Sequence, residues 1–200
     1  MAAVYDRVMA RSERAGLSAW RGELLAPLEG RVLELGAGTG VNLPHYPDAL
    51  ERLVLTEPDP HMLRRLARRA RELRPGTEVV GARAERLPYP AESFDAIVAT
   101  LVLCTVPDPD AVLAEVVRLL RSGGQLLFVE HVASAELAAR RWQGRIEPLW
   151  RHVAGGCRLT RDPRQRMREL GLRIERCEEG RLPGSPFFVR PAIRGAAAKP

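Results

Sequence analysis

Short apolar runs alternate with amphipathic helical segments along most of this chain. Residues with helical spacing of apolar positions predict helices at His61–Leu73 and Asp110–Leu120. Runs rich in Val, Ile and Leu, bounded by Gly, Pro or Asp, predict buried strands at Arg31–Leu35, Leu53–Thr56, Glu78–Ala82, Phe94–Ala99 and Gln125–Glu130. This β-α-β series predicts a doubly wound α/β sheet, which binds ligands at the carboxyl ends of its strands.

The alternation changes after the fifth predicted strand. Residues 132–160 are rich in arginine, only partly helical in pattern, and contain Trp142 and Trp150. We expect this segment to form a substrate cap over the strand ends, and an ordinary surface excursion is the alternative. The rest of the single domain, residues 1–200, is predicted to comprise an N-terminal helical lid at residues 1–30, a helix at Asp162–Leu170, and strands at Leu172–Cys177 and Phe187–Arg194.

Composition restricts the class of protein. A hydrophobic content of 46% and a charged content of 28% are typical of a globular chain. No apolar run approaches the roughly 18 residues of a membrane span, and the first residues do not resemble a signal peptide. The cysteines Cys104, Cys157 and Cys177 match neither a zinc pattern nor a disulfide framework, so we predict no metal site, reduced thiols and a cytoplasmic location.

The net charge of +6 does not make nucleic acid the favoured partner. Lys199 is the only lysine, and the arginines alternate with Glu and Asp along predicted helices. Charge alone supports only non-specific binding, and no nucleic-acid-binding signature accompanies it. The densest basic run, HMLRRLARRARELR, is predicted to be a solvated helix face opposite Leu66 and Ala70.

The first predicted strand runs into a glycine-rich turn, RVLELGAGTG at residues 31–40. A dinucleotide-binding G-x-G-x-x-G turn would need its third glycine at position 41, where Val41 stands. Gly40 instead gives G-x-G-x-G, and Glu34 precedes the first glycine by two positions. The combination resembles motif I of the class I S-adenosylmethionine (SAM)-dependent methyltransferases, with a methyltransferase type 11 domain.

Further stretches resemble that family in the same order. LVLTEPDP places Glu57 where the family binds the ribose hydroxyls, and GARAERLPYPAESFDAIVA resembles its adenine-binding stretch, with Arg83 where the family has Asp. Met62 is placed to pack on adenine, and Tyr5-Asp6 resembles a pair that closes over the cofactor. The resemblance implies a Rossmann-like seven-stranded sheet with an antiparallel last strand, SAM as cofactor and S-adenosylhomocysteine (SAH) as product. The cofactor-binding positions it implies are Glu34, Gly36, Ala37, Gly38, Gly40, Glu57, Pro58, Ala84, Glu85, Thr100 and Leu101.

Methyl transfer needs alignment, exclusion of water and sometimes a base, so no catalytic residue is obligatory. His131 is the first candidate base, because it ends a strand at the ligand-binding edge; His152 and His45 follow, and a structural role is the alternative for each. Cys104 is predicted to be a small buried apolar residue and not a nucleophile. Asn42 either binds the cofactor carboxylate or forms a local turn.

Three other stretches of sequence indicate the class of methyl acceptor. LVLCTV, FVEHVA and EPLWRHVAGGCRLTR resemble the microsomal thiol S-methyltransferase-like proteins and their soluble bacterial relatives, which implies a small-molecule thiol acceptor. Arg151, His152 and Arg158 could supply the base or positive field that a thiolate needs. The alternatives are a phospholipid amine headgroup or a quinone-ring carbon as acceptor and, from other classes, a nicotinamide oxidoreductase or a non-catalytic SAM-binding protein.

The assembly and any membrane contact are less defined. We expect a monomer or a homodimer. Peripheral contact of residues 132–160 with a membrane is not favoured, because Gly and Pro interrupt the helical face of that segment.

Overall fold

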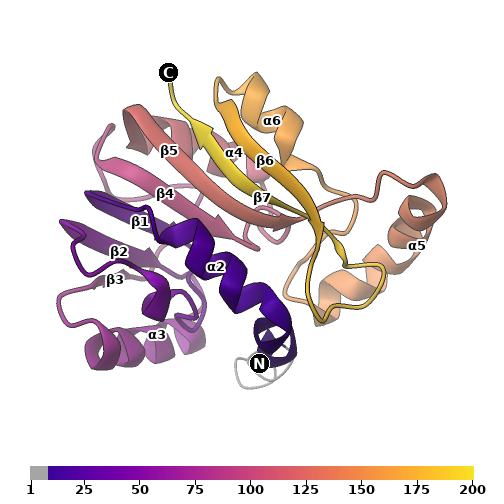
Figure 1. The fold of residues 1–200 in the computed structure, drawn as a ribbon, viewed down its shortest axis with the longest axis horizontal. Coiled ribbons are helices and arrows are strands. Elements are labelled where there is room, and N and C mark those ends of the chain that lie inside the picture. Colours follow the sequence, from indigo (N-terminus) through magenta and orange to yellow (C-terminus); the bar gives the residue numbers. More distant parts are fainter. Residues whose placement is uncertain (1–8) are drawn as a thin grey trace.

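A central sheet with helices on both faces forms the protein (Figure 1); the computed structural model describes residues 9–200. The strand order is β3-β2-β1-β4-β5-β7-β6, with β7 antiparallel to both of its neighbours and the other pairs parallel. The strands are β1 Arg31–Leu35, β2 Arg52–Thr56, β3 Glu78–Val80, β4 Phe94–Thr100, β5 Leu120–His131, β6 Arg173–Arg181 and β7 Pro191–Ala198. This confirms the predicted doubly wound α/β sheet with an antiparallel last strand.

Three of the helices begin in the same way. Asp59, Asp108 and Asp162 each accept a hydrogen bond from a backbone N–H of the first turn, and each is followed by a proline at the first helical position. Both features favour a helix start at that residue. The helices are the π-helical turn Glu13–Leu17, α2 Ser18–Leu25, the 3-10 turn Leu43–His45, α3 Pro60–Leu73, α4 Pro109–Leu119, α5 Leu137–Val153 and α6 Pro163–Glu169.

The two faces of the sheet bury different side chains. Val32 of β1 packs in one cluster with residues of α2 and α3, whereas Leu33 and Leu35 pack in another with residues of α4 and α6. Alternate residues of a strand point to opposite faces, so Glu34 shares the face that α2 and α3 cover. Figure 1 shows α2 crossing the front of the sheet and α4 behind it.

The predicted closing strand is misplaced. We expected Phe187–Arg194, but the strand runs from Pro191 to Ala198. Phe188 packs edge-on against Trp150, with ring centroids 5.1 Å apart, and so belongs to the turn before the strand. The strand itself is built mainly of small residues. At Gly195 a side chain is excluded, because a Cβ there would lie 1.9 Å from the Arg176 carbonyl oxygen, where the register of β6 shifts.

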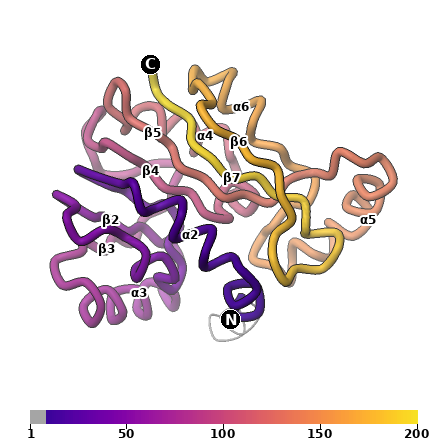
Figure 2. The backbone as a smooth tube through the Cα atoms, in the orientation of Figure 1, coloured from indigo at the N-terminus to yellow at the C-terminus, as the bar shows by residue number. Residues whose placement is uncertain are grey.

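The segment after β5 differs from the prediction too. The expected interruption at Gly and Pro is wrong, because α5 continues through Gly144 and Pro148. Both residues are exposed, so the carbonyl that lacks a proline N–H partner faces water. Figure 2 shows α5 projecting beyond the sheet. None of the helices in residues 9–200 is long and apolar enough to span a bilayer.

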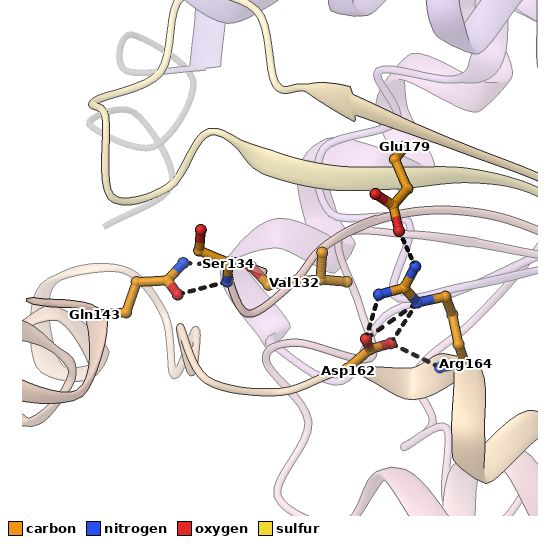
Figure 3. Close-up of polar contacts among 6 residues, drawn as sticks. All are labelled: Val132, Ser134, Gln143, Asp162, Arg164 and Glu179. Atoms are coloured by element: carbon orange, nitrogen blue, oxygen red, sulfur yellow. Dashed lines mark hydrogen bonds and ion pairs between the residues drawn. The ribbon is translucent and has the colours of Figure 1, made fainter. Parts of the chain in front are cut away.

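One buried side chain fastens α5 to the sheet (Figure 3). The Gln143 amide oxygen accepts from the backbone N–H of Ser134 at 2.7 Å, and its nitrogen donates to the carbonyl oxygens of Val132 and Phe188. Next to it, Arg164 of α6 pairs with Asp162 and with Glu179 of β6. The Gln143 contacts thus hold α5 at the end of β5, and the Arg164 contacts join α6 to β6.

Replacing Gly195 by Ala should lower the free energy of unfolding by about 2–3 kcal/mol or more, because the new methyl group overlaps the neighbouring strand. Gly144→Ala is the matched control. A Cβ there meets no atom within 4 Å, so this variant should be stabilised by about 0.5–1 kcal/mol. Denaturant unfolding measures both, and equal stability of the two variants would contradict this account of β7.

Candidate active site

The turn after β1 contains three glycines whose conformations other residues rarely adopt. Gly36, Gly38 and Gly40 have φ angles of 54°, 59° and 82°. A Cβ on Gly40 would lie 2.7 Å from a Leu43 methyl carbon, so this glycine permits close packing inside the chain. A Cβ on Gly38 would meet no atom within 4 Å. Open space therefore begins at Gly38, where a ligand can approach the backbone.

The carboxylate of Glu57 closes one side of this turn. One of its oxygens accepts from the Gly38 N–H at 2.9 Å, and the other accepts from the Asp59 N–H at 2.9 Å. Burial raises the pKa of Glu57. Each carboxylate oxygen can accept a second hydrogen bond, so the group retains acceptor capacity for hydroxyls. The predicted pairing of a glycine turn with an acid at the end of β2 is present.

Glu34 is directed into the protein. Its carboxylate accepts from the Asn42 amide nitrogen at 2.8 Å and from the Tyr46 hydroxyl at 2.7 Å, and burial raises its pKa. Asn42 is fully buried. This hydrogen bond orients the Asn42 side chain, so Glu34 stabilises the glycine turn from inside the protein.

An arginine of α2 completes this network, and sequence reasoning missed it. Arg21 donates to the Asn42 side-chain oxygen and to the Thr100 hydroxyl, both at 2.9 Å, and its Nε pairs with Glu13 at 3.1 Å. Its guanidinium is almost completely buried. Arg21 brings positive charge to the ends of β1 and β4, which suits a carboxylate ligand.

The end of β4 is held by a second residue that the sequence did not reveal. Leu101 has a φ of 60°, a strained conformation for a residue with a side chain. Glu130 of β5 accepts from the backbone N–H groups of Val102 and Leu103 at 2.9 Å and of Cys104 at 3.1 Å. Burial raises the pKa of Glu130 to about 7. The only sequence signal was an acid within an apolar strand.

The remaining predicted cofactor positions lie at the same edge. Ala37 donates its N–H to the Thr56 carbonyl, and Pro58 is exposed. Ala84 is buried, whereas Glu85 pairs with Arg83 at 3.0 Å. Arg83 thus neutralises the neighbouring acid. Met62 is half-buried at the start of α3, and Tyr5-Asp6 lies outside the described residues.

The three candidate bases are in different surroundings. His131 is only 1% exposed, and neither ring nitrogen has a hydrogen-bond partner. His45 lies 3.2 Å from the Ser18 hydroxyl, and burial lowers its pKa. His152 and Arg151 are exposed on α5, and Arg158 is exposed in the segment that follows the helix. Of the three histidines, His131 is therefore the one with buried nitrogens available to a partner.

Sequence comparisons agree with this geometry. A family model described as Methyltransferase domain matches residues 33–128. Thiol S-methyltransferase TMT1B of Homo sapiens is 36% identical over 198 residues, which cover 97% of this chain and 81% of that protein. Phosphatidylethanolamine N-methyltransferase of Cereibacter sphaeroides is 35% identical over 146 residues, covering 68% of this chain and 70% of that protein.

The fold has solved counterparts as well. The structure of geranyl diphosphate methyltransferase in complex with SAM matches with a TM-score of 0.75, covering 98% of this chain and 90% of that one. At 16% identity, this likeness concerns the fold alone.

The buried Glu130 predicts a pH-dependent stability. Its pKa of about 7 in the folded protein exceeds the value of about 4.3 for an unfolded chain. The folded state therefore holds a proton that the unfolded state has lost, and stability falls as the pH rises from about 4.5 to about 7. Between pH 5 and 7.5, the wild type should lose about 2 kcal/mol more than Glu130→Gln in denaturant unfolding. The exposed control Glu178→Gln should behave as wild type, and an equal loss in Glu130→Gln would contradict the assignment.

Proposed function

The chain belongs to the methyltransferase domain family, and from this premise we propose that it methylates a small-molecule thiol. It is a SAM-dependent methyltransferase, with SAH as its product. One observation carries the choice of acceptor. The family model ends at residue 128, whereas the likeness to the human thiol S-methyltransferase covers 97% of the chain and so includes residues 132–160.

The residues at the carboxyl edge fit this cofactor. Gly38 leaves space beside its backbone, and the buried Glu57 carboxylate next to it suits the hydroxyls of a ribose. Arg21, held by Asn42 and Thr100, suits the methionyl carboxylate. When bound, SAM supplies a methyl group on a sulfonium sulfur, which is already an activated electrophile.

The remaining predicted positions complete the proposed cofactor site. Glu34, Gly36 and Gly40 shape the turn; Ala37, Pro58, Ala84, Glu85, Thr100 and Leu101 line the edge around it.

The acceptor side is proposed to lie under residues 132–160, which act as a cap, with residues 9–30 as the described part of a lid. A thiol reacts as its thiolate, so the site must remove a proton and favour negative charge. His131 has two buried nitrogens without a partner and is the proposed base. We further infer a cytoplasmic location, because Cys104, Cys157 and Cys177 are all free thiols.

A phospholipid amine is the second candidate acceptor, and one observation favours it. Trp142, Leu149 and Val153 lie on one side of α5 and are 51–73% exposed, and Arg145 and Arg151 lie between them in the sequence. An apolar face with basic neighbours suits a lipid surface. The likeness to the bacterial phosphatidylethanolamine N-methyltransferase points the same way.

An acceptor panel should show SAH release with alkyl and aryl thiols, and little release with phosphatidylethanolamine vesicles or quinol analogues. His131→Gln should lower kcat on thiols about 100-fold, which is typical for loss of a general base, with unchanged SAH affinity. The loss should shrink at high pH, where the free thiol ionises without help.

Two results of the panel would contradict the proposal. If the phosphatidylethanolamine amine is methylated and the thiols are not, the phospholipid is the favoured acceptor. A kcat of His131→Gln equal to wild type at every pH would assign that histidine a structural role only.

Glu57→Gln should weaken SAH binding about 10–100-fold, because hydrogen bonds to a charged acceptor contribute about 1.5–3 kcal/mol each. Isothermal titration measures the affinity. Glu178→Gln, an exposed carboxylate on β6, is the control and should bind as wild type. If Glu57→Gln also binds as wild type, the ribose is held elsewhere.

A further inference from the structure

The side chains of Cys104 and Cys157, which are far apart in the sequence, interact with each other. Cys104 lies in the turn after β4, and Cys157 follows α5. The N–H of Arg158 donates to the carbonyl oxygen of Cys104 at 2.8 Å. A Cβ on Gly156 would lie 2.9 Å from the carbonyl oxygen of Thr105. The residues on both sides of Cys157 therefore contact the backbone beside Cys104.

A nearby arginine holds the two segments together. Arg161 donates to the carbonyl oxygens of Leu103 at 2.9 Å and of Val106 at 2.6 Å. Glu130 holds the N–H of Cys104 from the other side. The backbone is thus fixed on both sides of the cysteine pair, and the two side chains need no large movement to meet.

The two thiols differ in acidity. Both are buried, Cys104 being 3% and Cys157 8% exposed. Contact with the Cys104 thiol and with His131 lowers the pKa of Cys157, whereas contact with Cys157 and burial raise the pKa of Cys104. Such a pair has one thiolate that can attack and one thiol that can follow.

We propose that Cys157 and Cys104 are a peroxide-reactive pair that forms an intrachain disulfide between the turn after β4 and the end of α5. The Cys157 thiolate attacks one oxygen of hydrogen peroxide, the O–O bond breaks, and the hydroxide released takes up a proton to become water. The sulfenic acid formed on Cys157 is then attacked by the Cys104 sulfur. The S–S bond forms, the S–OH bond breaks, and the Cys104 proton leaves with the hydroxyl as a second water.

His131 gives the pair its second, independent feature. Its ring is buried, has no hydrogen-bond partner on either nitrogen, and neighbours Cys157. An imidazole in this position can hold the proton that the Cys157 thiol loses. Among the described residues, no group of three His, Cys, Asp or Glu side chains is arranged to hold a metal ion.

Cys177 is the internal control. It lies in β6, and burial raises its pKa, so it should react more slowly. The proposal does not depend on the identity of the methyl acceptor, because disulfide formation is detected without any acceptor or cofactor.

The test treats the reduced full-length protein with hydrogen peroxide and maps its tryptic peptides without reduction. We expect a mass loss of about 2 Da and a cross-link between peptides 87–118 and 152–158, which contain Cys104 and Cys157. Cys177→Ser should give the same cross-link. Cys104→Ser should accumulate a sulfenic acid on Cys157 that dimedone traps, and Cys157→Ser should leave Cys104 unlabelled.

Several results would overturn the proposal. They are a cross-link that involves peptide 177–181, oxidation of Cys157 to sulfinic acid in the wild type without a cross-link, or equal dimedone labelling of Cys104 and Cys157 in the two single variants. If circular dichroism shows that a serine variant does not fold, the peptide map of the oxidised wild-type protein still tests whether the cross-link forms. Methylation activity in the reduced sample is measured separately, so its absence would count against the proposed function and not against the disulfide.

Discussion

Buried carboxylates at the carboxyl edge of the sheet hold the loops that form the candidate site. Glu34, Glu57 and Glu130 each accept two or more hydrogen bonds, from a turn or from backbone N–H groups at this edge. A buried carboxylate is costly when it lacks such partners, because the hydration it has lost is not replaced. Moving one of these loops away would take hydrogen-bond donors from the carboxylate that it contacts. The site geometry is therefore fixed by the protein before a ligand binds.

The central part of the fold follows from local sequence. The bounds of β1 agree with its apolar run, and α3, α4 and α6 each start within one residue of the predicted position. The last strand was misplaced, because Phe187 and Phe188 suggest a strand by propensity, but both lie in a turn in which Phe188 packs against Trp150 of α5. The continuity of α5 depends on the exposure of Pro148, which local pattern does not reveal. The failures occur where packing between distant segments decides the structure.

The candidate site divides in the same way. The pairing of Gly38 with Glu57 could be predicted, since a glycine turn and a strand-terminal acid leave adjacent parallel strands. The role of Arg21 could not be predicted, because its contact with Thr100 joins residues 79 positions apart. In the sequence, nothing distinguishes Arg21 from the other arginines of the chain. The role of Glu130 could not be predicted either, since it accepts hydrogen bonds from a turn 26–28 residues away. The glycine turn and the strand-terminal acid belong to a recognisable motif, whereas the roles of Arg21 and Glu130 depend on contacts with segments distant in the sequence.

His131 connects the chemistry of the acceptor to that of the cysteines. A buried polar group without a hydrogen bond costs about 1–3 kcal/mol, so the two buried nitrogens of His131 favour binding of a partner. The acceptor proton and the Cys157 thiol are the two partners within the proposed chemistry. Both partners need the same ring to take up their proton, so His131 cannot serve both at once. The redox state of the pair and the availability of the base are therefore linked through a single ring.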